Sequence, residues 1–234
     1  MLKYQAIAEK IYHSICQQDL PKGSQLANIE ELINQYQVSR TTIIKALDRL
    51  ERKSVIYQVQ GSGIFVRQRK KKGYLNLVTS NGFTEDLGNL AGGVQVLTLD
   101  VIFPNDEVQT NLNCQADDEV YYVKRLRYLD GKIYALEQSY YLKKLIPYLN
   151  REIAENSIFE YIDHVYQINI GFSDKYLELI AIDELTGCYL QLPAGTTALF
   201  MQEIFYTNSG EPFDFSKVIY HKDNAKFCVQ SHAK

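Results

Sequence analysis

The sequence of 234 residues predicts an α+β protein, in which a small helical domain precedes a larger, mostly antiparallel sheet with helices. Apolar residues follow a helical period up to Leu50, whereas β-prone runs joined by tight turns dominate after Gly73. The charge changes sign at the same point. Residues 1–72 carry 13 Lys and Arg against 6 Asp and Glu, and the remaining residues carry 12 against 22. We therefore expect two domains, of which the basic one is a candidate for a polyanionic partner.

Three helices are predicted in the N-terminal domain. The first covers Tyr4–Gln18 and ends before Pro21 and Gly23, because these residue types break helices. The second covers Ile29–Tyr36. The third follows Ser39, whose side chain suits an N-cap, and its apolar side chains are expected to face the core: Ile43, Ala46, Leu47 and Leu50.

A β-hairpin is predicted after these helices, with Val55–Gln60 and Ile64–Val66 as strands and Gly61-Ser62-Gly63 as the turn. Three helices followed by a hairpin are typical of a winged helix-turn-helix, in which the third helix enters the major groove of DNA. The candidate DNA contacts lie on the first turns of that helix and at the hairpin tip: Arg40, Thr41, Thr42, Lys45, Gly61 and Ser62. A helical domain that binds another protein is the alternative.

A run of basic residues marks the predicted domain boundary, because five of the six residues in Arg67–Lys72 are Lys or Arg. We expect a DNA-binding domain at residues 1–67, a basic linker at 68–75 and a second domain at 76–234. The linker either adds phosphate contacts or is only a solvated connection, and its composition does not decide between these functions.

The pattern of the second domain predicts a mostly antiparallel sheet with helices. Val120–Leu129 and Ile133–Leu142 are expected to form a hairpin around Asp130-Gly131, a dipeptide that favours a tight turn. The other predicted strands are Val94–Phe103, Ile168–Leu179, Leu199–Thr207 and Phe213–Tyr220, with Phe227–Val229 closing the sheet, and the predicted helices are Ser157–Val165 and Ile182–Leu190.

Arg125 and Arg127 are the main candidates for ligand binding in this domain. They lie two residues apart on one predicted strand and therefore share a face. Two guanidinium groups on one face suit a phosphate or a carboxylate. Thr84 and Ser157 are expected to add hydroxyl groups, and the helix after Ser157 begins with backbone N–H groups available to an anion. Cross-strand salt bridges on a solvated face are the alternative.

Other site classes find no support in the sequence. The four Cys form no CxxC pair and the four His show no metal-ligand spacing, so no metal or cofactor is expected. No run of about 18 apolar residues occurs, and the N-terminal segment lacks the apolar core of a signal peptide. We therefore expect a cytoplasmic protein without a membrane partner.

The whole chain resembles the GntR family of bacterial transcription regulators, HutC subfamily, whose second domain is a UTRA effector domain with a chorismate-lyase-like fold. The matching residues are Val38–Thr42, Ala46-Leu47, Leu50-Glu51, Gly61–Val66, Phe83–Asp86, Lys124–Arg127, Asp130-Gly131, Glu137–Tyr140, Asn156–Tyr161, Gly210–Pro212 and His221–Asp223. The resemblance implies that an effector's phosphate is held at Thr84, Arg125, Arg127 and Ser157. It also implies that Glu137, Asp214 and Tyr220 face a sugar-like part.

Several positions depart from the family pattern. Glu30 and Ile44 stand where the family has DNA-contacting arginines, and Ser62 stands where the wing usually reads Gly-Arg-Gly. Asp214 stands where many members have Glu. A glutamate at a DNA surface repels phosphate, so we expect weaker binding or an unusual operator.

The resemblance implies a homodimeric regulator, and we expect a repressor of a sugar-catabolism or sugar-uptake operon. It would bind a pseudo-palindromic operator in double-stranded DNA and be relieved by a phosphorylated sugar. One alternative is a protein-interaction module with a degenerate DNA-binding head. A chorismate-lyase-like enzyme is disfavoured, because the sequence shows no Ser/His/Asp or Cys/His constellation and no phosphate-binding Gly loop.

Overall fold

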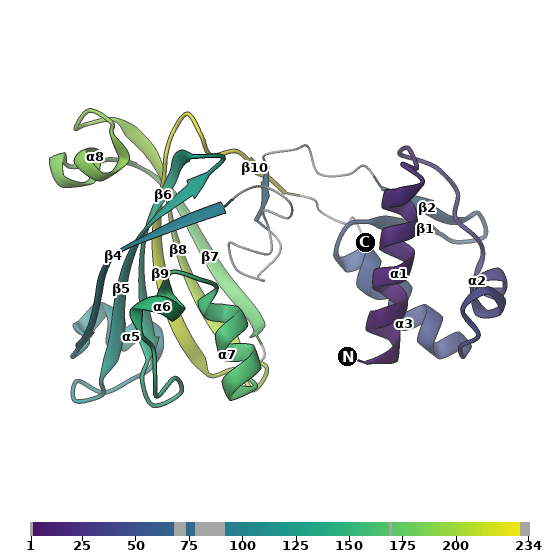
Figure 1. Cartoon of the computed structure of the whole chain (residues 1–234), viewed down its shortest axis with the longest axis horizontal. Helices are drawn as coiled ribbons and strands as arrows, with labels where there is room; N and C mark the ends of the chain where they lie inside the picture. The colour runs from purple at the N-terminus through teal and green to yellow at the C-terminus, as the bar shows by residue number, and fades with distance from the viewer. Residues whose placement is uncertain (1, 68–73, 78–91, 169, 230–234) are drawn as a thin grey trace. The chain divides into compact units, whose positions relative to one another are not determined.

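The computed structural model describes residues 2–67, 74–77, 92–168 and 170–229, and the chain divides into two compact units (Figure 1). The first unit is described over residues 2–67, and the second from Tyr74 onward. Thr84 and most of the predicted linker lie outside the described residues. None of the helices within these ranges has both the length and the apolar character needed to cross a membrane.

The first unit consists of three helices and a hairpin, as predicted: α1 (Lys3–Gln17), α2 (Ile29–Tyr36), α3 (Arg40–Arg52), β1 (Ile56–Val59) and β2 (Gly63–Val66). Local sequence fixes both helix starts. Asn28 accepts a hydrogen bond from the backbone N–H of Glu31 (3.0 Å), and Ser39 Oγ accepts one from that of Thr42 (3.3 Å). Gln37 ends α2 in the left-handed conformation, with φ of 52°.

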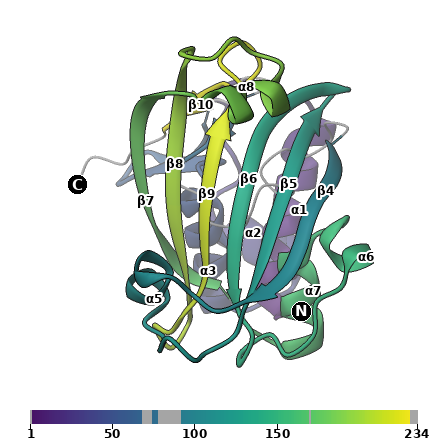
Figure 2. The same ribbon diagram turned by 90° about the vertical axis from the view of Figure 1, so that its left-hand side faces the viewer.

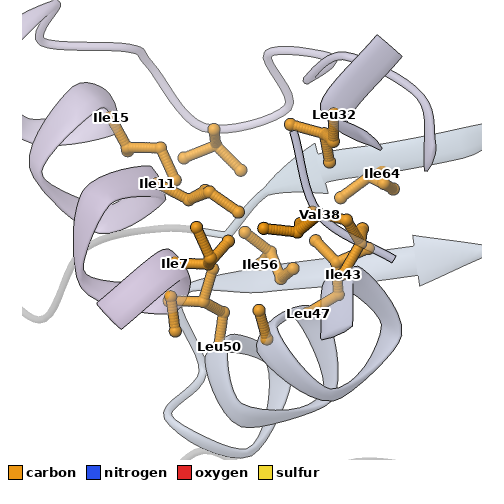
Figure 3. Close-up of a cluster of buried hydrophobic side chains, with 13 residues drawn as sticks. Ile7, Ile11, Ile15, Leu32, Val38, Ile43, Leu47, Leu50, Ile56 and Ile64 are labelled. Atoms are coloured by element: carbon orange, nitrogen blue, oxygen red, sulfur yellow. The ribbon is translucent and has the colours of Figure 1, made fainter. Parts of the chain in front are cut away.

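One apolar core joins these elements (Figure 3). Its buried side chains come from all three helices, the turn before α3 and both strands: Ile7, Ala8, Ile11, Ile15, Leu32, Val38, Ile43, Ala46, Leu47, Leu50, Ile56, Ile64 and Val66. The core includes the four side chains of α3 that the sequence pattern placed inward. It therefore fixes which face of α3 is left for solvent or a partner.

The second unit is built on a six-stranded antiparallel sheet in the order β4-β5-β6-β9-β8-β7 (Figure 2). The strands are β4 (Gly92–Ile102), β5 (Val120–Leu129), β6 (Lys132–Leu142), β7 (Ile170–Ala181), β8 (Thr197–Thr207) and β9 (Pro212–Tyr220). Asp130 and Gly131 have φ of 48° and 75°, the left-handed pair that a two-residue hairpin requires.

Helices cover parts of both faces of this sheet. On one face, α6 (Arg151–Ala154) and α7 (Ile158–Tyr166) pack over β4, β5 and β6, where Ile158 and Ile162 meet Tyr141. On the other face, α5 (Asp106–Leu112) packs beside Phe215 and α8 (Glu184–Leu190) packs near Leu136. The site described below lies on the face that α6 and α7 cover.

The prediction that Phe227–Val229 closes the main sheet is wrong. The last strand, β10 (Phe227–Cys228), pairs in parallel with β3 (Leu75–Asn76) in a separate two-stranded sheet. Short apolar runs show that a strand forms but not which strand it pairs with. The sequence analysis also missed α5 and α6, although Asn105 and Asn150 cap their first turns through side-chain oxygens.

The buried position of Leu47 yields a stability prediction. Leu47→Ala leaves a cavity in the core of the first unit and should lower the free energy of unfolding of that unit by about 2–5 kcal/mol. Chemical denaturation followed by circular dichroism measures this loss. Ile44→Ala is the matched control, because Ile44 on the same helix is 40 % exposed and should cost less than about 1 kcal/mol. Equal losses in both variants would contradict the assigned helix face.

Candidate functional site

The start of α3 presents polar side chains to solvent. Arg40, Thr41 and Lys45 are exposed, whereas Thr42 is partly buried. The hydroxyls of Thr42 and Ser39 lie 2.8 Å apart, so Thr42 takes part in the cap of its own helix. Arg40, Thr41 and Lys45 therefore have the accessibility that contact with a nucleic acid needs.

Glu30 and Arg40 form an ion pair between α2 and α3. Both side chains are more than half exposed, so the pair stabilises the fold little. Its effect is electrostatic, because the carboxylate lowers the positive potential at the start of α3 and occupies a donor of Arg40. Glu30, which we expected to weaken DNA binding by repelling phosphate, is thus paired directly with Arg40, a predicted DNA contact.

The hairpin tip exposes backbone. Gly61 and Ser62 are exposed, and Gly61 has φ of 76° with no atom near the position where a side chain would begin. Gln25 donates a hydrogen bond from Nε2 to the carbonyl oxygen of Ser62 (3.1 Å), which ties the tip to the segment before α2. The tip therefore has room for close approach to a partner's backbone.

In the second unit, one face of the sheet carries the buried polar side chains. Among the described residues of this unit, seven polar or charged side chains are buried: Arg125, Arg127, Glu137, Ser139, Glu203, Asp214 and Ser216. The strand register places all seven on the face covered by α6 and α7. Burying polar groups costs free energy unless they are paired. A concentration of them on one face therefore indicates a binding surface.

Glu137 bridges the two arginines. Its Oε1 accepts a hydrogen bond from Arg125 Nη2 (2.9 Å), and its Oε2 accepts one from Arg127 Nε (2.5 Å). Arg125 and Glu137 are direct neighbours across β5 and β6, and Arg127 shares their face. The sequence analysis offered cross-strand salt bridges on a solvated face as the alternative to a ligand site. The salt bridges are present, but the face that carries them is buried.

Despite burial, Glu137 raises the pKa of Arg125, whereas burial and the neighbouring Arg125 lower the pKa of Arg127. Burial by itself raises the pKa of Glu137, but Arg125 and Arg127 outweigh burial and lower it to about 2. Glu137 is therefore ionised at neutral pH. The three side chains together carry one net positive charge in a buried setting, which favours the approach of an anion.

A chain of hydrogen bonds leads from Glu137 to Asp214. Ser139 Oγ donates to Glu137 Oε1 (3.2 Å), and Ser216 Oγ lies 2.7 Å from Ser139 Oγ and 2.9 Å from Asp214 Oδ1. Because Ser216 has one hydroxyl proton, it donates either to Ser139 or to Asp214. Asp214 Oδ2 and Arg125 Nε are both buried without a hydrogen-bond partner among the described residues. Such unpaired atoms are costly, and a bound ligand would satisfy them.

Five of the seven predicted effector residues lie on the buried sheet face that α6 and α7 cover. Arg125, Glu137, Asp214 and Tyr220 join Arg127 there. Ser157 caps α7 by accepting from the backbone N–H of Glu160 (3.3 Å). The end of the preceding helix, α6, lies at the site, because Arg125 Nη1 donates to the carbonyl oxygen of Ala154 (3.2 Å). Thr84 lies outside the described residues.

Five polar residues of this face were not singled out from the sequence: Ser139, Ser173, Lys175, Glu203 and Ser216. Their signal was the alternation of polar residues on β6 and β9, where Ser139 follows Glu137 and Ser216 follows Asp214 at a spacing of two. Glu203 and Lys175 gave no local signal, because only strand pairing places them beside Ser216.

Comparison with known proteins identifies the two units. A model of the bacterial regulatory proteins of the gntR family matches residues 3–66, and a model of the UTRA domain matches residues 89–226. The chain belongs to the GntR family. Both domains are those of bacterial transcriptional regulators, not of enzymes, and regulators of this family bind operator DNA.

Relatives support this assignment over the full length. The chain is 43 % identical to YydK of Bacillus subtilis (strain 168), an uncharacterized HTH-type transcriptional regulator, over 100 % of this chain and 99 % of that protein. The crystal structure of YydK matches with a TM-score of 0.88, over 99 % of this chain and 100 % of that one. The mannosyl-D-glycerate transport/metabolism system repressor MngR of Escherichia coli (strain K12) is 28 % identical, over 99 % of this chain and 96 % of its own.

The buried carboxyl of Asp214 yields a pH prediction. Burial raises its pKa well above the usual value, and Glu137 and Glu203 add to the rise. The folded state therefore disfavours the ionised form of Asp214, which lowers stability at neutral pH, and this penalty vanishes below the unfolded-state pKa of about 3.9. Asp214→Asn should raise the melting temperature by roughly 3 °C at pH 7, a shift that about 1 kcal/mol produces.

Melting curves between pH 3.5 and 8 test this difference. The gain over the natural chain should shrink as the pH falls and should be absent at the acidic end. A gain that is independent of pH would show that the carboxyl of Asp214 is not the group responsible.

Proposed function

We propose that this regulator is a homodimeric repressor, which binds a pseudo-palindromic operator through its N-terminal units and releases it when a phosphorylated sugar binds the second unit. The observation that carries the effector assignment is the buried trio of Arg125, Arg127 and Glu137. Its net positive charge and the unpaired Nε of Arg125 favour an anion with several oxygens. The relative MngR is named for a mannosyl-D-glycerate system, in which a sugar is linked to an acid, and this is in keeping with an anionic sugar effector.

Glu137 provides a physical link between binding of the effector and a change of contacts in the second unit. The carboxylate holds the same guanidinium groups that a phosphate needs, so the phosphate must displace it or share them with it. A displaced Glu137 becomes available to hydroxyls of the sugar. Because Arg125 also holds the end of α6, this exchange changes contacts in the segment that leads to α7. By linkage, operator and effector weaken each other's binding by the same factor.

On the DNA side, α3 would enter the major groove and the hairpin tip would lie along the backbone. Arg40, Thr41, Thr42 and Lys45 would reach base edges and phosphates, with Gly61 and Ser62 at the tip. The basic run before Gly73 would either add phosphate contacts or serve only as a solvated connection.

Substitutions of Glu30 and of Lys45 should change DNA affinity in opposite directions. Glu30→Gln releases Arg40 and removes a repulsive charge, so it should tighten binding to DNA from the chain's own promoter region by about threefold to tenfold at low salt. Lys45→Ala should weaken binding by a similar factor and reduce the salt slope by about one. Fluorescence anisotropy against salt concentration measures both.

Glu152→Gln is the matched control, because Glu152 is an exposed glutamate of the second unit. It should leave DNA affinity unchanged. Absence of DNA binding by the natural chain at low salt would reject the operator proposal and favour a protein-binding head.

The effector proposal predicts stabilisation that depends on phosphate. Thermal melting with glucose 6-phosphate, trehalose 6-phosphate and cellobiose 6′-phosphate, each beside its unphosphorylated sugar, should give a shift only for phosphorylated members. Ligand at 100 times its Kd adds about 2.7 kcal/mol. Arg125→Met should weaken that ligand's binding more than about tenfold.

Lys132→Met serves as the control for loss of a positive charge on the same hairpin, because Lys132 is exposed. Its melting shift should equal that of the natural chain. Equal shifts from phosphorylated and plain sugars would reject the anion site.

A further inference from the structure

The polar face continues well beyond the arginines. Four side chains form one row across neighbouring strands, since Ser139 on β6 pairs with Ser216 on β9, Ser216 with Glu203 on β8, and Glu203 with Lys175 on β7. Lys175 Nζ lies 3.2 Å from Glu203 Oε1, which also accepts a hydrogen bond from Ser173 Oγ (2.7 Å). The row thus begins beside one buried ion pair and ends at another.

The row is buried along most of its length. Ser139 is 0 %, Ser216 4 % and Glu203 6 % exposed. The middle of a sheet face that packs into a protein core is normally apolar, because a buried hydroxyl or carboxylate loses its hydration. Folding alone therefore does not explain why two separate ion pairs, joined by hydroxyl groups, are buried on this face.

Asp214 and Tyr220 lie on β9, the strand between those of Glu137 and Glu203, and Asp214 is two residues from Ser216 of the row. Each interacts electrostatically with both Glu137 and Glu203, although these glutamates lie on β6 and β8. Asp214 Oδ2 is buried and has no hydrogen-bond partner in the described part of the chain. The strand between the two ends thus carries an unpaired polar atom that a ligand would engage.

The length of the row sets the size of that ligand. Arg125 lies on β5 and Glu203 on β8, three strand spacings apart, or about 14 Å at the backbone. A single sugar ring whose phosphate is held by the arginines ends before β8. A second ring reaches it.

We propose that Glu203, Lys175 and Ser216 form a second subsite, which reads hydroxyl groups of a second sugar ring of the effector. The effector is then a phosphorylated disaccharide or glycoside rather than a monosaccharide phosphate. This inference rests on the proposed function, in which Arg125 and Arg127 hold the phosphate. Carboxylate and ammonium groups at the far end accept from and donate to hydroxyls, and Ser216 does both.

Isothermal titration of the full-length chain tests the second subsite. The probes are glucose 6-phosphate, trehalose 6-phosphate and cellobiose 6′-phosphate, which share a phosphorylated glucose and differ in the second ring. At least one disaccharide phosphate should bind the natural chain about tenfold more tightly than glucose 6-phosphate does. Glu203→Gln and Ser216→Ala should each remove most of this preference, and Glu203→Gln should change the affinity for glucose 6-phosphate by less than about twofold.

Glu178→Gln is the matched control, because Glu178 is exposed on β7 and its register places it on the opposite face. It should keep the full preference. Glucose 6-phosphate binding as tightly as both disaccharide phosphates would overturn the second subsite while leaving the phosphate site intact. Equal losses for all three probes in both variants would also overturn it, because Glu203 and Ser216 would then act only through the fold. No binding by any phosphorylated sugar would overturn the proposed function as well.

Discussion

The contact of Glu137 with Arg125 and Arg127 is the constraint on which the second unit depends. Two guanidinium groups on one face of a sheet repel each other, and burial removes the water that would screen them. One carboxylate on the neighbouring strand relieves both by presenting one oxygen to each. The hairpin of β5 and β6 fixes this arrangement through its register, so the charges are placed by backbone geometry rather than by flexible side chains.

This arrangement leaves the trio stable but incompletely neutralised. The trio retains one positive charge, and Arg125 keeps a buried N–H without a partner among the described residues. In the function proposed above, an anion that replaces Glu137 would exchange one charge-assisted contact for another rather than create contacts from nothing. The net gain would come from the additional charge and from the hydroxyl contacts that Glu137 could then make. Selectivity would consequently depend on how well the rest of the ligand fits beside the anion.

Local sequence was enough to predict the first unit. Ser39 begins α3 as an N-cap, and the apolar period of that helix assigned its buried face. The same kind of signal placed Arg125 and Arg127 on one face. It did not show that this face is buried, because burial depends on α6 and α7 packing over it, and α6 was not recognised. The pairing of β10 with β3 was missed for a related reason, since a two-residue strand carries no pattern that selects its partner.

The least predictable feature is the strand order. The chain continues from β6 through β7 and β8 before β9 returns to pair with β6, so Ser216 joins Ser139 across a gap of 77 residues. No spacing in the sequence connects Glu203 to Glu137, yet β9 lies between their strands and carries Asp214 toward both. The end of the face that carries Arg125 and Arg127 comes from one local hairpin, whereas the far end comes from distant strands. The two ends can therefore change independently, and in the proposed function this would let one fold keep the same charged group while it reads different sugars beyond it.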